Sequence, residues 1–225
     1  MWEEAERYNE TLTGRPTHDP FIDDEDIAMP DEYRQTLNIK GIMGYVDIPG
    51  IDVYLPIYHG TADHVLEKGA GHLEGSTLPL GGSFRHSVIT GHSGLVHAKM
   101  FTDLTELAQG DLFYIHVLGE ILAYEVEKIT ITEPHITDDL MVFDGKDYCT
   151  LLTCTPYGIN THRLLVRGER VEYNPEVKDS IRKISDSGAD DTVARIAIIT
   201  AAVMLLLIIA AIAMSAGKHR KCRIE

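Results

Sequence analysis

Cys154 and His92 are the two side chains in this sequence whose types and settings favour covalent catalysis. Cys154 follows a β-like run at 149–153, and His92 falls at a glycine-flanked break just after a second short run at 87–90. A cysteine attacks as its thiolate, and a histidine that is distant in sequence but close in space is a common base for it. Side chains at strand ends are held rigidly and can face a cleft. The pair therefore predicts a nucleophilic site.

Arg163 is the candidate cationic partner of this pair. It opens a third β-like run, 163–166, which follows a turn-rich segment. A guanidinium near a thiol favours the thiolate or stabilises a developing oxyanion. Arg167 falls on the same face of that run but farther from its start. His162 is an alternative base, although on a strand it would point away from its neighbour Arg163.

The motifs around these three residues resemble those of sortases. They are Thr-Gly-His at 90–92, Thr-Leu-Leu-Thr-Cys at 150–154, and Arg163 nine residues after the cysteine. The longer string at 153–163, Thr-Cys-Thr-Pro-Tyr-Gly-Ile-Asn-Thr-His-Arg, is similar to the pilin-polymerising branch, the class C sortases. The resemblance implies a cysteine transpeptidase in which Cys154, His92 and Arg163 are the catalytic residues.

The same resemblance implies a substrate and a reaction. A Leu-Pro-x-Thr-Gly-like sorting signal (LPxTG) would be cleaved through a thioester on Cys154. In class C sortases a lysine amine of another pilin subunit then takes the acyl group, so the implied partners are pilin subunits that carry a sorting signal and an acceptor lysine.

Three other functions remain open at this stage. A sortase that anchors surface proteins to peptidoglycan would use the same three residues and a different amine. A papain-like hydrolase is disfavoured, because its cysteine precedes its histidine in the chain. The third alternative is a non-catalytic surface scaffold in which the cysteine and the histidine are incidental.

Residues 14–30 are rich in proline and acidic side chains, and a flexible linker is the simplest interpretation of such a composition. The segment nevertheless contains Asp19, Pro20 and Phe21. Class C sortases are similar to one another in a lid whose Asp-Pro-aromatic tip lies in the active-site groove. By this resemblance Phe21 covers the thiol and Asp19 pairs with Arg163, which would make the lid autoinhibitory until substrate displaces it.

Short strand-like runs predict a mainly β protein with short helices, folded as a closed or nearly closed β-barrel. The runs lie at 39–60 with glycine and proline breaks, 87–90, 111–118, 121–132, 149–153 and 163–166. Helical turns are expected at 1–13, 61–68, 98–107 and within 133–145, and a glycine-rich loop at 69–82. Sortases have such a barrel, so the pattern and the resemblance agree.

The C-terminal region predicts a membrane anchor. Residues 196–217 carry no charge and are almost wholly apolar, and at about 1.5 Å per residue they can cross a hydrocarbon core of about 30 Å. A buried core helix is disfavoured, because this run is apolar on all sides. Four Lys and Arg residues follow at 218–223. The positive-inside rule then places the tail in the cytoplasm and residues 1–192 outside the cell.

The predicted organisation has five parts. They are an N-terminal helix and lid at 1–36, a barrel at 37–175, a juxtamembrane tether at 176–192, a transmembrane helix at 193–217 and a basic tail at 218–225. The first residues have neither the basic start nor the apolar run of a secretory signal peptide.

The composition and the spacing of histidines and cysteines argue against several classes of ligand. The net charge of −15 argues against nucleic acid as a partner, because phosphate backbones bind basic surfaces. The eleven histidines are scattered without ligand spacing, and Cys149 and Cys154 lack the interval of a zinc site. We therefore expect no metal and no cofactor. Cys149 would point to the opposite face of a strand from Cys154, which favours a core position for it.

Overall fold

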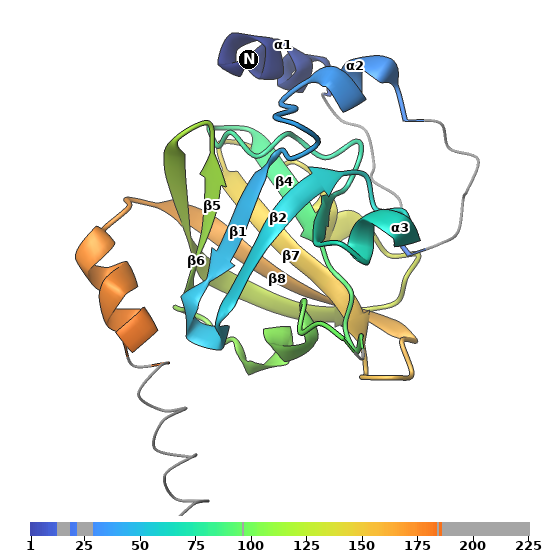
Figure 1. Ribbon diagram of the computed structural model, residues 1–225, viewed down its shortest axis with the longest axis vertical. Helices are drawn as coiled ribbons and strands as arrows, with labels where there is room; N and C mark the ends of the chain where they lie inside the picture. Colours follow the sequence, from blue (N-terminus) through green and yellow to red (C-terminus); the bar gives the residue numbers. More distant parts are fainter. Residues whose placement is uncertain (13–18, 22–28, 96, 184, 186–225) are drawn as a thin grey trace, which may run out of the picture. The chain divides into compact units, whose positions relative to one another are not determined.

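The described residues of the computed structural model form eight β-strands that close into a barrel (Figure 1). The structure describes residues 1–12, 19–21, 29–95, 97–183 and 185. The strands are β1 (Gly44–Ile48), β2 (Val53–His59), β3 (Ala70–His72), β4 (Arg85–Thr90), β5 (Leu112–Val117), β6 (Glu120–Thr132), β7 (Asp147–Thr155) and β8 (His162–Val171). Their order around the barrel is β1-β2-β3-β4-β7-β8-β6-β5, which confirms the mainly β, closed architecture.

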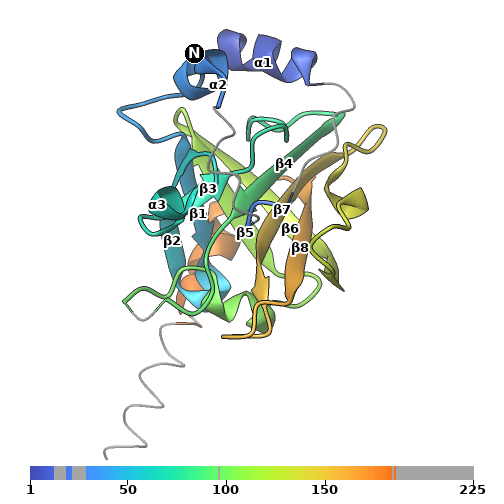
Figure 2. The same ribbon diagram turned by 90° about the vertical axis from the view of Figure 1, so that its right-hand side faces the viewer.

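The helices are short and lie outside the sheet. They are α1 (Trp2–Thr11), α2 (Asp31–Gln35), α3 (Asp63–Leu66) and the 3-10 turns η1 (Pro49–Ile51), η2 (Thr102–Glu106) and η3 (Asp138–Leu140). In both views α1 and α2 cover one end of the barrel (Figures 1 and 2). The Asn9 side chain fastens α1 there, because it exchanges two hydrogen bonds with the backbone of Leu78.

The alternation of side chains along the strands creates two apolar clusters. The main core fills the barrel and includes Cys149 and Leu151 of β7, as the opposite orientations of Cys149 and Cys154 predict. A second group, which we call the outer cluster, lies on the other face of the same strands. It consists of Val88, Leu152 and Leu165 on that face, joined by Leu73 just after β3 and Leu140 of η3.

Most of the expected elements are present, two of them in a different form, while α2 and a helical segment at 175–183 were not expected. The glycine-rich segment at 69–82, expected as a loop, contains β3, which pairs in parallel with β2. Three residues are too few to show an alternating pattern, and Gly71 permits the close packing, because a Cβ there would lie 2.2 Å from the carbonyl oxygen of Gly60. The helix expected at 98–107 shrinks to the 3-10 turn η2, which still buries Leu104.

The chain after β8 turns into a helical segment at 175–183, and the described fold forms one unit over Met1–Arg182. The membrane helix expected at 193–217 and the basic tail at 218–225 lie outside the described residues. Among the helices that are described, none has the length and apolar character needed to span a membrane.

Candidate active site

Cys154 and Arg163 lie directly opposite each other on neighbouring strands. They form a register pair of the antiparallel strands β7 and β8, one pair before the end of the ladder at Thr155 and His162. Opposed residues of an antiparallel pair present their side chains on the same face, with Cβ atoms about 5 Å apart. The strand pairing therefore places Cys154 and Arg163 side by side on one face, independently of the loop that joins the strands.

The end of β4 lies beside the end of β7, so the structure brings the His92 loop to the same edge as Cys154. Figure 2 turns β4, β7 and β8 toward the viewer. Three hydrogen bonds tie the loop to β7: Gly91 N to Leu152 O (3.1 Å), Thr153 Oγ1 to Gly91 O (2.7 Å) and Ser93 Oγ to Cys154 O (2.8 Å). Gly91 is needed there, because a Cβ would lie 2.8 Å from the Phe101 ring.

A carboxylate that the sequence did not reveal lies next to His92. Oδ1 of Asp63, at the start of α3, is 3.8 Å from Nε2 of His92. The Asp63 side chain is 77% exposed, so solvent screens this attraction strongly. No local motif links the two residues, and only the packing of α3 against the sheet brings them together.

Asp19 is buried against Arg163. One carboxylate oxygen accepts a hydrogen bond from Nε of Arg163 at 2.8 Å, and the other accepts one from Nη2 at 2.7 Å. Both residues are more than nine-tenths buried, with Asp19 4% and Arg163 7% exposed. Such a two-pronged ion pair is among the strong interactions of proteins, and here it occupies the guanidinium that faces the thiol.

The Phe21 ring contacts both Arg163 and His92. Its ring centroid is 5.0 Å from the guanidinium carbon of Arg163 and 6.0 Å from the ring centroid of His92. The ring also packs against the outer cluster, and the intervening Pro20 is buried. The three residues Asp19–Phe21, which we call the lid tip, therefore cover this edge of the barrel.

Burial and the lid tip disfavour the charged form of the thiol. Desolvation raises the pKa of Cys154 above its ordinary value, Arg163 lowers it, and the Asp19 carboxylate raises it again. Burial opposes the charge of Arg163, but the hydrogen bond to Asp19 and the charge of that carboxylate raise the pKa of the guanidinium overall. With the lid tip in place, a neutral thiol faces a charged arginine.

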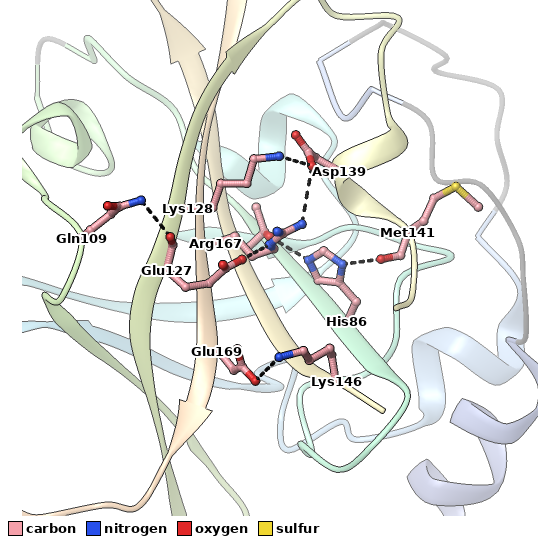
Figure 3. A network of polar contacts seen from close by, with 10 residues as sticks. His86, Gln109, Glu127, Lys128, Asp139, Met141, Lys146, Arg167 and Glu169 are labelled. Carbon is pink, nitrogen blue, oxygen red and sulfur yellow. Dashed lines mark hydrogen bonds and ion pairs between the residues drawn. The ribbon is translucent and has the colours of Figure 1, made fainter. Parts of the chain in front are cut away.

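Arg167, the second arginine on this face of β8, belongs to a separate polar network (Figure 3). Its Nε donates to Oε1 of Glu127 at 2.5 Å, and its Nη1 lies 3.5 Å from Oδ1 of Asp139. Two aromatic rings flank the guanidinium, Tyr148 with its centroid at 4.6 Å and Phe143 at 4.9 Å. The charge of Arg167 is thus neutralised within this network.

His86 anchors the loop between β6 and β7 in the same network (Figure 3). Its ring nitrogens lie 2.7 Å from the Met141 carbonyl oxygen and 2.7 Å from Oγ1 of Thr150. Burial lowers the pKa of His86 to about 4, so the imidazole is neutral near pH 7. The loop that it holds contributes Leu140 to the outer cluster.

The remaining candidates do not share the face that carries Cys154 and Arg163. Cys149 is fully buried in the barrel, where burial raises the pKa of its thiol well above the ordinary value, which confirms its place in the core. His162 is exposed and forms a hydrogen bond with the adjacent Thr161 hydroxyl at 2.9 Å. His162 comes one residue before Arg163 on β8, so its side chain lies on the opposite face of the strand.

A closed barrel with a partly buried cysteine, an arginine and a histidine at the ends of neighbouring strands has the features of a cysteine enzyme. The Sortase domain family matches residues 46–171, which is more than half of the chain. The chain therefore belongs to the sortase family, whose members are cysteine transpeptidases.

Solved structures and characterised relatives agree with this assignment. Sortase C-1 from Streptococcus pneumoniae is 52% identical with a TM-score of 0.73, over 76% of this chain and 88% of that chain. Sortase C-1 from Actinomyces oris is 47% identical with a TM-score of 0.74, over 76% and 96%. Sortase A of Bacillus anthracis is 26% identical over 157 residues, which are 67% of this chain and 71% of that protein.

Proposed function

We propose that this chain is a pilin-polymerising sortase that cleaves an LPxTG-like sorting signal through a thioester on Cys154 and transfers the acyl group to a lysine amine of another pilin subunit. The observation that carries the proposal is the lid tip, which occupies Arg163 with Asp19 and lies beside His92 with Phe21. The similarity to the two C-1 sortases supports the same branch of the family.

In the first half-reaction the Cys154 thiolate attacks the carbonyl carbon of the signal's threonine. The planar guanidinium of Arg163 stabilises the negative charge that develops on the carbonyl oxygen. Protonated His92 gives its proton to the departing glycine amine as the peptide bond breaks. The products are a thioester on Cys154, a free glycine amine and a neutral His92.

In the second half-reaction the lysine amine of the next pilin subunit attacks the thioester carbonyl. His92 takes the proton that the amine loses, and the Cys154 thiolate leaves. An isopeptide bond forms, and the enzyme returns with a thiolate and a protonated histidine. Atoms and charge balance without a cofactor.

Substrate must displace the lid tip before this chemistry begins. Departure of Asp19 removes a charge that raises the pKa of Cys154, while Arg163, which lowers it, remains. Release of the lid therefore both uncovers the thiol and favours its reactive form. By this account the lid couples substrate entry to activation.

The apolar run at 196–217 and the basic residues after it support attachment to the cell membrane with the barrel outside. The apolar run would then contact membrane lipid. Labelling of Cys222 by a membrane-impermeant maleimide in intact cells would contradict this orientation, since the proposal places that thiol in the cytoplasm.

The acceptor amine distinguishes pilus assembly from anchoring to peptidoglycan. The full chain carrying Asp19→Ala and Phe21→Ala is incubated with an LPxTG peptide and equal amounts of two acceptors, a lysine-containing pilin domain and a peptidoglycan stem peptide. We expect mass spectrometry to find the isopeptide to lysine as the dominant product. Preferential transfer to the stem peptide would favour the anchoring sortase instead.

A further inference from the structure

Thr90, the last residue of β4, is fully buried, and its Oγ1 has no hydrogen-bond partner among the described residues. Buried hydroxyl groups are nearly always paired, because an unpaired one loses its bonds to water without compensation. A valine of nearly the same shape would avoid that cost. The hydroxyl therefore calls for a role outside the folding of the barrel.

The position of Thr90 along β4 suggests that role. Val88, two residues earlier and on the same face, belongs to the outer cluster. Thr90 lies opposite Leu152 in the parallel pairing of β4 and β7, and Cys154 follows Leu152 by two residues on that face. Thr90 thus lies between the outer cluster and the edge of the barrel that carries Cys154 and His92.

The lid tip provides evidence that the outer cluster can bind a peptide segment. Phe21 packs against the outer cluster, while Asp19, two residues earlier, reaches Arg163 opposite Cys154. One short stretch of chain therefore extends from the outer cluster to Arg163. A sorting signal that replaces the lid, with its apolar residues on the outer cluster and its scissile carbonyl at Cys154, must pass over Thr90.

We infer that the Thr90 hydroxyl binds the sorting signal by donating a hydrogen bond to a backbone carbonyl next to the scissile bond. This inference rests on the proposed function and assigns Thr90 as a substrate-binding residue of that site. The Thr90 hydroxyl is then unpaired while the lid tip is in place, and it forms a hydrogen bond with the peptide after the lid tip leaves. A backbone carbonyl suits the role, because it is present whichever residue occupies the variable position of the signal.

The test compares Thr90→Val with Thr90→Ser in the full chain carrying Asp19→Ala and Phe21→Ala. Loss of one hydrogen bond lowers kcat/KM for an LPxTG peptide about fivefold to tenfold in the valine variant, mainly through KM. The serine variant keeps kcat/KM within about twofold, because it retains the donor. Thermal unfolding of the valine variant occurs at the same or a higher temperature, by up to about 4 °C.

Ser87 provides a matched control on the same strand. Its Oγ is also buried without a partner, but it faces the barrel interior, in register with Cys149. Ser87→Ala removes an unpaired hydroxyl as Thr90→Val does, and it leaves kcat/KM unchanged.

The outcomes separate this inference from the proposed function. Equal kcat/KM for Thr90→Val and its parent overturns the inference while the parent's turnover upholds the function. A fall in kcat/KM accompanied by a lower unfolding temperature, or shared by Thr90→Ser, also overturns it, since either points to a structural effect. A parent that forms no thioester overturns both.

Discussion

At the scale of single residues, the surroundings of Cys154 control the charge state of its thiol. Its thiol sits between Arg163, which lowers its pKa, and the lid carboxylate and burial, which raise it. The types of these residues were readable in the sequence, because a cysteine and an arginine at strand ends already indicate a nucleophile with a cationic partner. The net effect of these groups on the pKa of Cys154 depends on how deeply they are buried, which a sequence motif does not predict.

This balance predicts the pH dependence of thiol reactivity. In the wild type the raised pKa keeps Cys154 neutral until high pH. Asp19→Ala with Phe21→Ala removes a raising charge and part of the burial, so the midpoint of the rate of alkylation against pH moves to lower pH. The measurement is the iodoacetamide rate from pH 5 to 10, followed by intact mass. An unchanged midpoint, or one displaced to higher pH, would contradict the role given to the lid tip.

Arg163→Lys tests whether a planar guanidinium is required. A lysine keeps the positive charge but cannot place two parallel N–H groups against an oxyanion or a carboxylate. We expect kcat to fall by about 100-fold or more, as for loss of an oxyanion donor, with an unchanged far-ultraviolet dichroism spectrum. Turnover near that of the parent would show that another group supplies the stabilisation.

At the scale of the elements, the helical segment at 175–183 is fastened to the barrel by a buried carboxylate. Asp47 of β1 is 1% exposed, and it lies 2.7 Å from Nζ of Lys178, 3.2 Å from Arg182 and 3.5 Å from His116. Burial alone would raise the pKa of Asp47, but the hydrogen bonds to His116 and Lys178 and the nearby charges lower it. Lys178 and Arg182 are therefore held against β1.

Asp47→Asn should destabilise the fold. Removing the carboxylate of a buried ion pair leaves Lys178 without its negatively charged partner, which costs about 3 kcal/mol at pH 7. Because the pKa of Asp47 is lowered in the folded state, its contribution is present above the ordinary carboxyl pKa and is lost as the pH falls below it. Urea unfolding should thus show a difference from wild type at pH 7 that shrinks toward pH 3. A difference that is constant over this range would refute the assignment.

The elements also show which features the sequence could predict. The β5–β6 hairpin and the cores of β7 and β8 were predicted at nearly their observed places, because each is a β-like run bounded by turn residues. β3 was not, because Ala70–His72 has only three residues and owes its strand to packing. The contact of Asp63 with His92 was also missed, since it depends on where α3 lies.

At the scale of the whole molecule, barrel closure assembles the site. The parallel pairing of β4 with β7 and the antiparallel pairing of β7 with β8 bring together residues from 92 to 163 in the chain. Local patterns predicted a barrel but could not predict which strands become neighbours, because long-range pairing depends on the whole sheet. The resemblance to sortases supplied that arrangement, and the position of the lid tip, 144 residues from Arg163 in sequence, follows it.

The thioester on Cys154 is tested by the intact mass of the enzyme during turnover. The full chain with Asp19→Ala and Phe21→Ala is mixed with an LPxTG peptide, quenched in acid and weighed beside the same protein carrying Cys154→Ala. A thioester mechanism predicts a mass gain equal to the peptide acyl fragment ending at threonine, absent from the Cys154→Ala protein and removed by hydroxylamine. An adduct that persists without Cys154, or peptide cleavage with no adduct dependent on that thiol, would contradict a thioester mechanism at this site.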